Sequence, residues 1–96
     1  MSGLFKDNEA SEFFCAVLSC ENTGDVCDFF EDLCTVKELQ SMIARFQVAK
    51  LLNAGVIYSE IVKKTGASTA TISRVNRALS YGSDGYKKVL ARGKTE

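Results

Sequence analysis

Residues 58–79 read YSEIVKKTGASTATISRVNRAL, a stretch that predicts two short helices joined by a glycine turn. Gly66 suits the left-handed position that ends the first helix, because a side chain there would cost roughly 1–2 kcal/mol. Ser68 is a good N-cap for the second helix, since its hydroxyl can accept a hydrogen bond from a first-turn amide. Apolar residues at spacings of three and four then give that helix one face to bury: Ile72, Val75 and Leu79. The stretch therefore predicts a helix-turn-helix.

The opposite face of the second helix is small and hydrogen-bonding at its start and basic further along. It consists of Thr69, Ala70, Ser73, Arg74, Asn76 and Arg77. A helix that lies in the DNA major groove needs such a face. An ordinary solvated helix carries acidic residues that pair with its lysines, but there is none between Gly66 and Leu79. The pattern favours DNA binding over two helices that merely share a glycine turn.

Charge is distributed unevenly along the 96 residues, although the net charge is zero. Residues 1–34 contain one basic and eight acidic residues, whereas residues 35–96 contain eleven basic and four acidic ones. Such a chain can present a basic face to phosphates while its acidic part stays away from them. The two parts can also neutralise each other in the fold. An apolar content of 46% without proline is typical of a single folded domain.

No apolar run reaches the length of a membrane span, about 18 residues, and no signal pattern is visible, so we expect a cytoplasmic protein. Its four cysteines are then expected as thiols. Cys20, Cys27 and Cys34 recur every seven residues, but no histidine or CxxC pair supports a zinc site. Small buried apolar residues are the favoured interpretation of these cysteines, with thiol oxidation left open. We expect no metal and no cofactor.

The remaining pattern predicts six helices and no strands, an all-α fold. A first helix is expected from about Asn8 to Ser19, and a second begins at residues 23–25. Thr35 and Glu38 form a T-x-x-E capping box that opens a long third helix. The predicted parts are acidic dimerisation helices in residues 1–34, a long core helix over 35–55, the helix-turn-helix over 58–80 and a C-terminal helix over 83–96.

The long helix is apolar around most of its circumference, at Val36, Leu39, Met42, Ile43, Phe46, Val48, Ala49, Leu51 and Leu52. Such a helix needs partners on several sides, and a 96-residue monomer has few helices to offer. We therefore expect an obligate homodimer. A two-fold dimer would also place two recognition helices about one DNA turn apart, roughly 34 Å.

Three motifs make the chain similar to the tryptophan repressor family, in its shorter YerC/YecD type: CTVKEL at 34–39, ARFQVAKLL at 44–52 and GASTATISRVNRAL at 66–79. The similarity covers roughly residues 34–90, and the last motif is the most specific. It implies an intertwined six-helix homodimer that binds palindromic double-stranded DNA as a transcriptional regulator, with repression as the expected effect.

The resemblance implies that Thr69, Ala70 and Ser73 face base edges. Ser59 stands where the family's first-helix arginine reaches DNA, which implies a different operator. The whole DNA-binding set is expected to be Ser59, Lys63, Lys64, Ser68, Thr69, Ala70, Ser73, Arg74, Asn76 and Arg77. Within this set, phosphate contacts are assigned to Ser59, Lys63, Lys64 and Arg77.

Arg45 and Arg74 match the two arginines that hold tryptophan in the family. However, Val75 replaces a glycine that leaves room for the ligand, and Ala78 replaces a serine that contacts its amino group. Overpacking costs about 1–3 kcal/mol, and the absence of a charge-assisted hydrogen bond costs about 1.5–3 kcal/mol. We therefore do not expect tryptophan as effector. The expected vestigial pocket consists of Thr35, Arg45, Thr71, Arg74 and Val75.

A protein-interaction module that uses the helix-turn-helix as a docking surface is the main alternative function. The zero net charge and the acidic first third support it. Affinity for duplex DNA at moderate salt separates the two. An enzyme is not expected, because the chain has no histidine and no recognisable pair of nucleophile and base.

Overall fold

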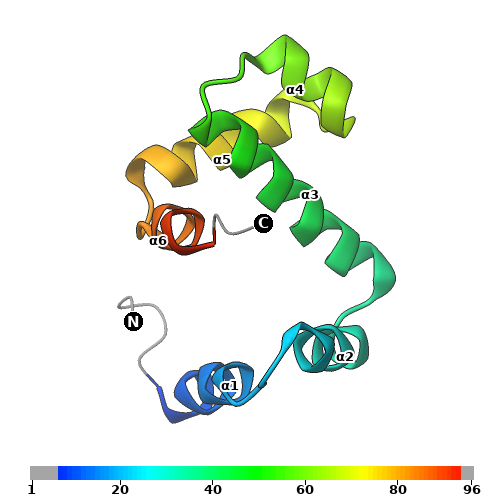
Figure 1. The fold of residues 1–96 in the computed structure, drawn as a ribbon, viewed down its shortest axis with the longest axis vertical. Coiled ribbons are helices and arrows are strands. Elements are labelled where there is room, and N and C mark those ends of the chain that lie inside the picture. The colour runs from blue at the N-terminus through cyan, green and yellow to red at the C-terminus, as the bar shows by residue number, and fades with distance from the viewer. Residues whose placement is uncertain (1–6, 94–96) are drawn as a thin grey trace. The chain divides into compact units, whose positions relative to one another are not determined.

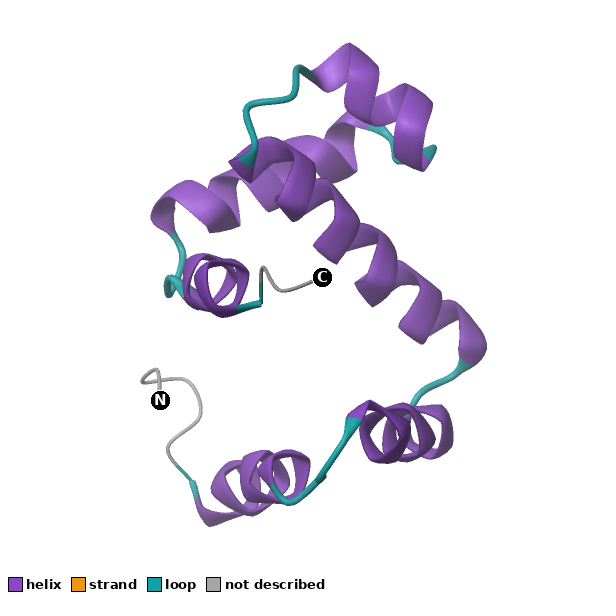
Figure 2. Cartoon of the chain, viewed as in Figure 1, coloured by secondary structure: helices purple, strands orange, loops and turns teal. Residues whose placement is uncertain are grey.

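Residues 7–93 are described in the computed structural model, and they form six α-helices with no strand in this range (Figures 1 and 2). The helices are α1 (Asn8–Leu18), α2 (Thr23–Leu33), α3 (Val36–Asn53), α4 (Tyr58–Thr65), α5 (Thr69–Tyr81) and α6 (Gly85–Arg92). The prediction of an all-α chain with six helices is confirmed for these residues. The end of the predicted C-terminal helix, at 94–96, lies outside the described residues. None of the helices in this range is long and apolar enough to cross a bilayer.

The chain divides into two compact units, one ending at Leu39 and the other beginning at Gln40. The first unit contains α1, α2 and the first turn of α3. Side chains cap both short helices: Asp7 Oδ1 accepts from the amide of Ala10 at 2.7 Å, and Asn22 Oδ1 from that of Asp25 at 2.8 Å. Phe13 and Phe29 join the two helices, with ring centroids 6.2 Å apart. Nevertheless, no residue between 7 and 39 is fully buried.

The cysteines of this unit are free thiols, and the prediction that they are buried is wrong for the single chain. Cys15 and Cys27 are exposed, and Cys20 and Cys34 are only half-buried. The physical reason is that a pair of short helices without a buried residue offers no interior for a sulfur atom. The Cys27 thiol instead donates to Glu31 Oε2 at 3.3 Å. This hydrogen bond and the negative charge of Glu31 raise the pKa of Cys27 above its ordinary value.

The predicted capping box at the start of α3 is confirmed. The Thr35 hydroxyl accepts from the amide of Glu38 at 3.0 Å, and the Glu38 carboxylate accepts from the amide of Thr35 at 2.8 Å. The other end of α3 closes in a Schellman arrangement. Gly55, at a φ of 83°, donates to the Leu52 carbonyl, and Val56 donates to the Leu51 carbonyl, both at 3.0 Å. The helix thus ends two residues before the predicted limit.

The second unit has a small apolar core that holds α4 and α5 against the C-terminal half of α3 (Figure 1). Its fully buried members are Val48, Ala49, Ile61, Ile72 and Val75. Full burial of an isoleucine or valine side chain stabilises a fold by about 1.5–3 kcal/mol. Tyr86 and Leu90 of α6 pack at the edge of the core. The prediction that Ile72, Val75 and Leu79 form the buried face of α5 is confirmed.

Replacing Gly66 by alanine is expected to lower the free energy of unfolding by about 1–2 kcal/mol. Gly66 has a φ of 73°, and a Cβ there would meet no atom within 4 Å, so the cost arises from the backbone alone. Gly85→Ala is the matched control, since its Cβ also meets nothing within 4 Å and its φ is not positive. Chemical denaturation at one protein concentration measures both variants. Equal stability of the two would contradict the expectation.

Candidate nucleic-acid interface

The turn between α4 and α5 is fixed by local hydrogen bonds. Gly66 adopts the left-handed conformation and donates to the Val62 carbonyl at 2.8 Å. The Thr65 hydroxyl donates to the Ile61 carbonyl at 2.7 Å and accepts from the amide of Ala67 at 3.1 Å. No pattern in the sequence predicts these two hydrogen bonds of the Thr65 hydroxyl. Together these bonds set the direction in which the chain enters α5.

Ser68 caps α5 as its residue type predicts. Its hydroxyl oxygen accepts from the Thr71 amide at 3.1 Å, while the hydroxyl proton is donated to Thr71 Oγ1 at 3.1 Å. Because its one hydroxyl proton is already engaged, Ser68 acts first as a helix cap. The side chain is nevertheless exposed, beside Thr69 and Ala70.

Almost all of the predicted DNA-binding residues are exposed. The exposed ones are Ser59, Lys63, Lys64, Ser68, Thr69, Ala70, Ser73, Arg74 and Arg77. Asn76 is half-buried. Since Ile72, Val75 and Leu79 are buried on the same helix, α5 has one apolar face in the core and one polar face in solvent. Both α4 and the outer face of α5 therefore expose polar side chains to solvent.

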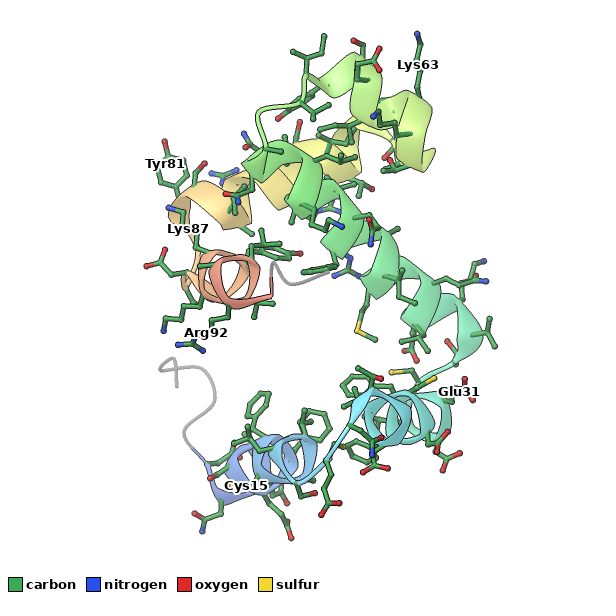
Figure 3. All side chains as sticks on the ribbon, viewed as in Figure 1. Cys15, Glu31, Lys63, Tyr81, Lys87 and Arg92 are labelled. Carbon is green, nitrogen blue, oxygen red and sulfur yellow. The ribbon has the colours of Figure 1, made fainter. Side chains whose placement is uncertain are left out.

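The outer face of α5 is basic, and its arginines are available. No acidic residue occurs in α5, and within residues 7–93 neither Arg74 nor Arg77 forms a salt bridge. Lys63 projects outward from α4 (Figure 3) and lies 3.8 Å from the carboxylate of Glu60. Both side chains of this pair are well exposed, at 76% and 47%, so the pair contributes little to stability. Lys63 would therefore readily exchange the Glu60 carboxylate for another anion.

Three of the five predicted effector-pocket residues line one pocket: Arg45, Thr71 and Arg74. This pocket has a volume of about 310 Å³, and its other lining residues are Ser41, Ala44 and Ala67. An Arg45 Nη2 proton is donated to Ser41 Oγ at 3.1 Å. Thr35 and Val75 do not line this pocket. Thr35 caps α3, and Val75 is 2% exposed within the apolar core.

A second, more open hollow lies on the outer face of α5. It has a volume of about 450 Å³ and is lined by Tyr58, Ser73, Asn76, Arg77 and Tyr81. The two tyrosines were absent from the predicted site. Tyr81 could have been found, because it lies four residues after Arg77 and eight after Ser73, on the same helical face. Tyr58 carries no such signal, since only the turn brings α4 beside α5.

Residues 8–94 match the family model described as Trp repressor protein. The chain belongs to the Trp repressor family. The family that its motifs predict is thereby confirmed, and its coarse functional class is that of helix-turn-helix DNA-binding regulators.

Three relatives extend this assignment over the whole chain. The uncharacterized protein YerC of Bacillus subtilis is 45% identical over 89 residues, which is 93% of this chain and 86% of YerC. The crystal structure of a TrpR-like protein from Eubacterium eligens superposes with a TM-score of 0.91 at 48% identity and covers 99% of both chains. A protein from Staphylococcus aureus described as a candidate Trp repressor has a TM-score of 0.89 and 46% identity, covering 95% of this chain and 91% of its own.

The two roles of Ser68 can be separated by two substitutions. Ser68→Ala removes the acceptor of the Thr71 amide and should lower the free energy of unfolding by about 0.5–2 kcal/mol. Ser68→Asp keeps an acceptor at the helix N-terminus, where a negative charge is favourable, and should retain stability. The aspartate should nonetheless weaken binding to duplex DNA, because it puts a negative charge on the exposed face. Thermal unfolding and a fluorescence-anisotropy DNA titration measure the two effects. Weaker DNA binding by the alanine variant than by the aspartate variant would contradict this expectation.

Proposed function

We propose that this protein is a sequence-specific DNA-binding transcriptional regulator that represses from a palindromic operator as a homodimer and does not respond to tryptophan. The observation that carries the proposal is the two-faced α5. Its apolar side packs in the core, while its outer side exposes small polar residues at the start and, further along, two arginines that form no salt bridge within residues 7–93. Such a helix can enter a major groove without any rearrangement of the fold.

The exposed apolar surface supports the dimer. Leu18 is 82% exposed, Val36 is 72% exposed and Ile43 is 54% exposed, and none of residues 7–39 is fully buried. Leaving this much apolar surface in water is unfavourable, and such patches usually mark interfaces between proteins. A second copy of the chain would cover them, and two-fold symmetry would present two α5 helices to two half-sites.

The contacts divide by position on the surface. Ser59, Lys63, Lys64 and Arg77 would contact phosphates, which set the position of the protein on DNA without reading its sequence. Thr69, Ala70 and Ser73 would read base edges, with Arg74 and Asn76 beside them. Ala70 suits an apolar contact to a thymine methyl, while the hydroxyls of Thr69 and Ser73 can donate or accept.

The place of Val75 argues against tryptophan as effector. Its side chain is part of the core, so the position that is glycine in tryptophan-binding members is filled here. The pocket that Arg45 and Arg74 line, to which Val75 does not contribute, would be a remnant of the effector site.

Selection from a pool of random duplexes, with and without tryptophan, tests the proposal directly. We expect enrichment of an inverted repeat that tryptophan does not change. Enrichment only in the presence of tryptophan would overturn the statement about Val75. Failure to enrich any sequence would instead favour the alternative of a protein-interaction module, which the acidic first unit would suit.

Substitutions of Lys63 and of Glu60 are expected to change the affinity for DNA in opposite directions. Lys63→Ala removes one positive charge per protomer and should weaken binding to all sequences alike, and the salt slope should fall by about one for each phosphate that is no longer neutralised. Glu60→Gln frees Lys63 from its partner and removes a negative charge, so it should strengthen binding at low salt. Ser73→Phe is the control, because a bulky residue there should change which sequences bind. Identical behaviour of the Lys63 and Ser73 variants would show that the two roles are wrongly assigned.

A further inference from the structure

The hollow on the outer face of α5 has a composition that points to a ligand. Each of its five lining residues, Tyr58, Ser73, Asn76, Arg77 and Tyr81, carries at least one hydrogen-bond donor. None is acidic and none is aliphatic. Within residues 7–93 none of the five side chains makes a hydrogen bond or a salt bridge. A shallow hollow lined by such donors and a guanidinium is suited to an anion that offers several acceptor oxygens.

We propose that this hollow binds one backbone phosphate of the operator DNA, held by the guanidinium of Arg77 and the hydroxyls of Tyr58 and Tyr81. The inference rests on the proposed function and deepens it, because it assigns a contact to two tyrosines that no family motif marks. In each DNA half-site, the protein would then have to contact this one phosphate at the same time as the bases that α5 reads.

The place of the hollow along α5 supports a phosphate as the bound group. Thr69 and Ala70 lie at the start of the helix, where a recognition helix meets base edges. Ser73 lies at one end of the hollow and Tyr81 at the other, about 12 Å further along at 1.5 Å per residue. Over that length the helix can pass from a base edge at Ser73 to the sugar-phosphate strand that borders the groove. Tyr58, the first residue of α4, closes the hollow from the side of the neighbouring helix.

The two tyrosines differ in freedom, and the difference suits a clamp. Tyr58 is 37% exposed, so part of its side chain is covered by the protein. Tyr81 is 87% exposed and stands out from the C-terminal end of α5 (Figure 3). A tyrosine has two side-chain torsions, so ordering its ring costs little entropy compared with a lysine or arginine. Tyr58 and Arg77 would receive the phosphate, and Tyr81 would close over it.

Tyrosine-to-phenylalanine variants test the clamp with the full chain and the enriched operator duplex. Tyr58→Phe and Tyr81→Phe each remove one hydroxyl per protomer and should weaken operator binding roughly 3- to 10-fold for each half-site, as expected for a hydrogen bond of about average strength. The salt slope should stay unchanged, because no charge is removed. Arg77→Ala should lower both the affinity and the salt slope. Tyr86→Phe is the matched control, since Tyr86 packs at the core edge and does not line the hollow. Circular dichroism verifies that each variant is folded.

Neutral methylphosphonates, placed one at a time along the operator backbone, identify the phosphate. Wild-type protein should lose affinity at one position per half-site. Tyr58→Phe and Tyr81→Phe should each lose less affinity than wild type at that position, because only Arg77 and the remaining hydroxyl still contact the phosphate. If wild type binds the operator but both variants bind equally well, with every backbone position sensed as before, the clamp is refuted while the regulator stands. If wild type binds no duplex, both proposals fail.

Free phosphate is the other source of the same chemistry. The chain has no tryptophan, so tyrosine fluorescence reports a titration with inorganic phosphate directly. Saturable binding of inorganic phosphate that Tyr58→Phe abolishes, without any coupled backbone position on the operator, would overturn the assignment to DNA.

Discussion

The burial of α5 against α3 and α4 is the interaction on which the rest of the second unit depends. Ile72 and Val75 project from one side of α5 and meet Val48, Ala49 and Ile61. Since the polar residues of α5 lie on the other side, this one packing interaction decides which side chains face solvent. Replacing part of this core would misdirect every residue of the outer face at once, even where those residues are unchanged.

Local signals predicted the helix-turn-helix correctly. Gly66, Ser68 and the Thr35–Glu38 pair act within three or four residues of themselves, so their residue types are enough to predict their hydrogen bonds. The core face of α5 was also predicted correctly, because the helical periodicity of its apolar residues determines that face. The family resemblance came from the same stretch and from the body of α3.

Features that depend on contacts between distant parts of the chain could not be predicted from the sequence. The cysteines were predicted to be small core residues, but none of the residues described between 7 and 39 is fully buried, so no core surrounds them there. Tyr58 reaches the hollow only because the turn folds α4 beside α5, and the spacing of residues in the chain does not encode that approach. Val75 was assigned correctly to the core, yet its exclusion from the arginine-lined pocket follows only from the packing of α5 on α3.

The hydrogen bond from Cys27 to Glu31 lowers the reactivity of an exposed thiol. A thiol reacts with oxidants and electrophiles as its thiolate, and the neighbouring carboxylate raises the pKa of Cys27. At neutral pH the sulfur therefore stays protonated to a greater degree than an isolated cysteine would. In α2 the acidic side chain restrains the reactivity of the sulfur, a task that a buried position performs in other proteins. Oxidants would thus meet this cysteine in its least nucleophilic form.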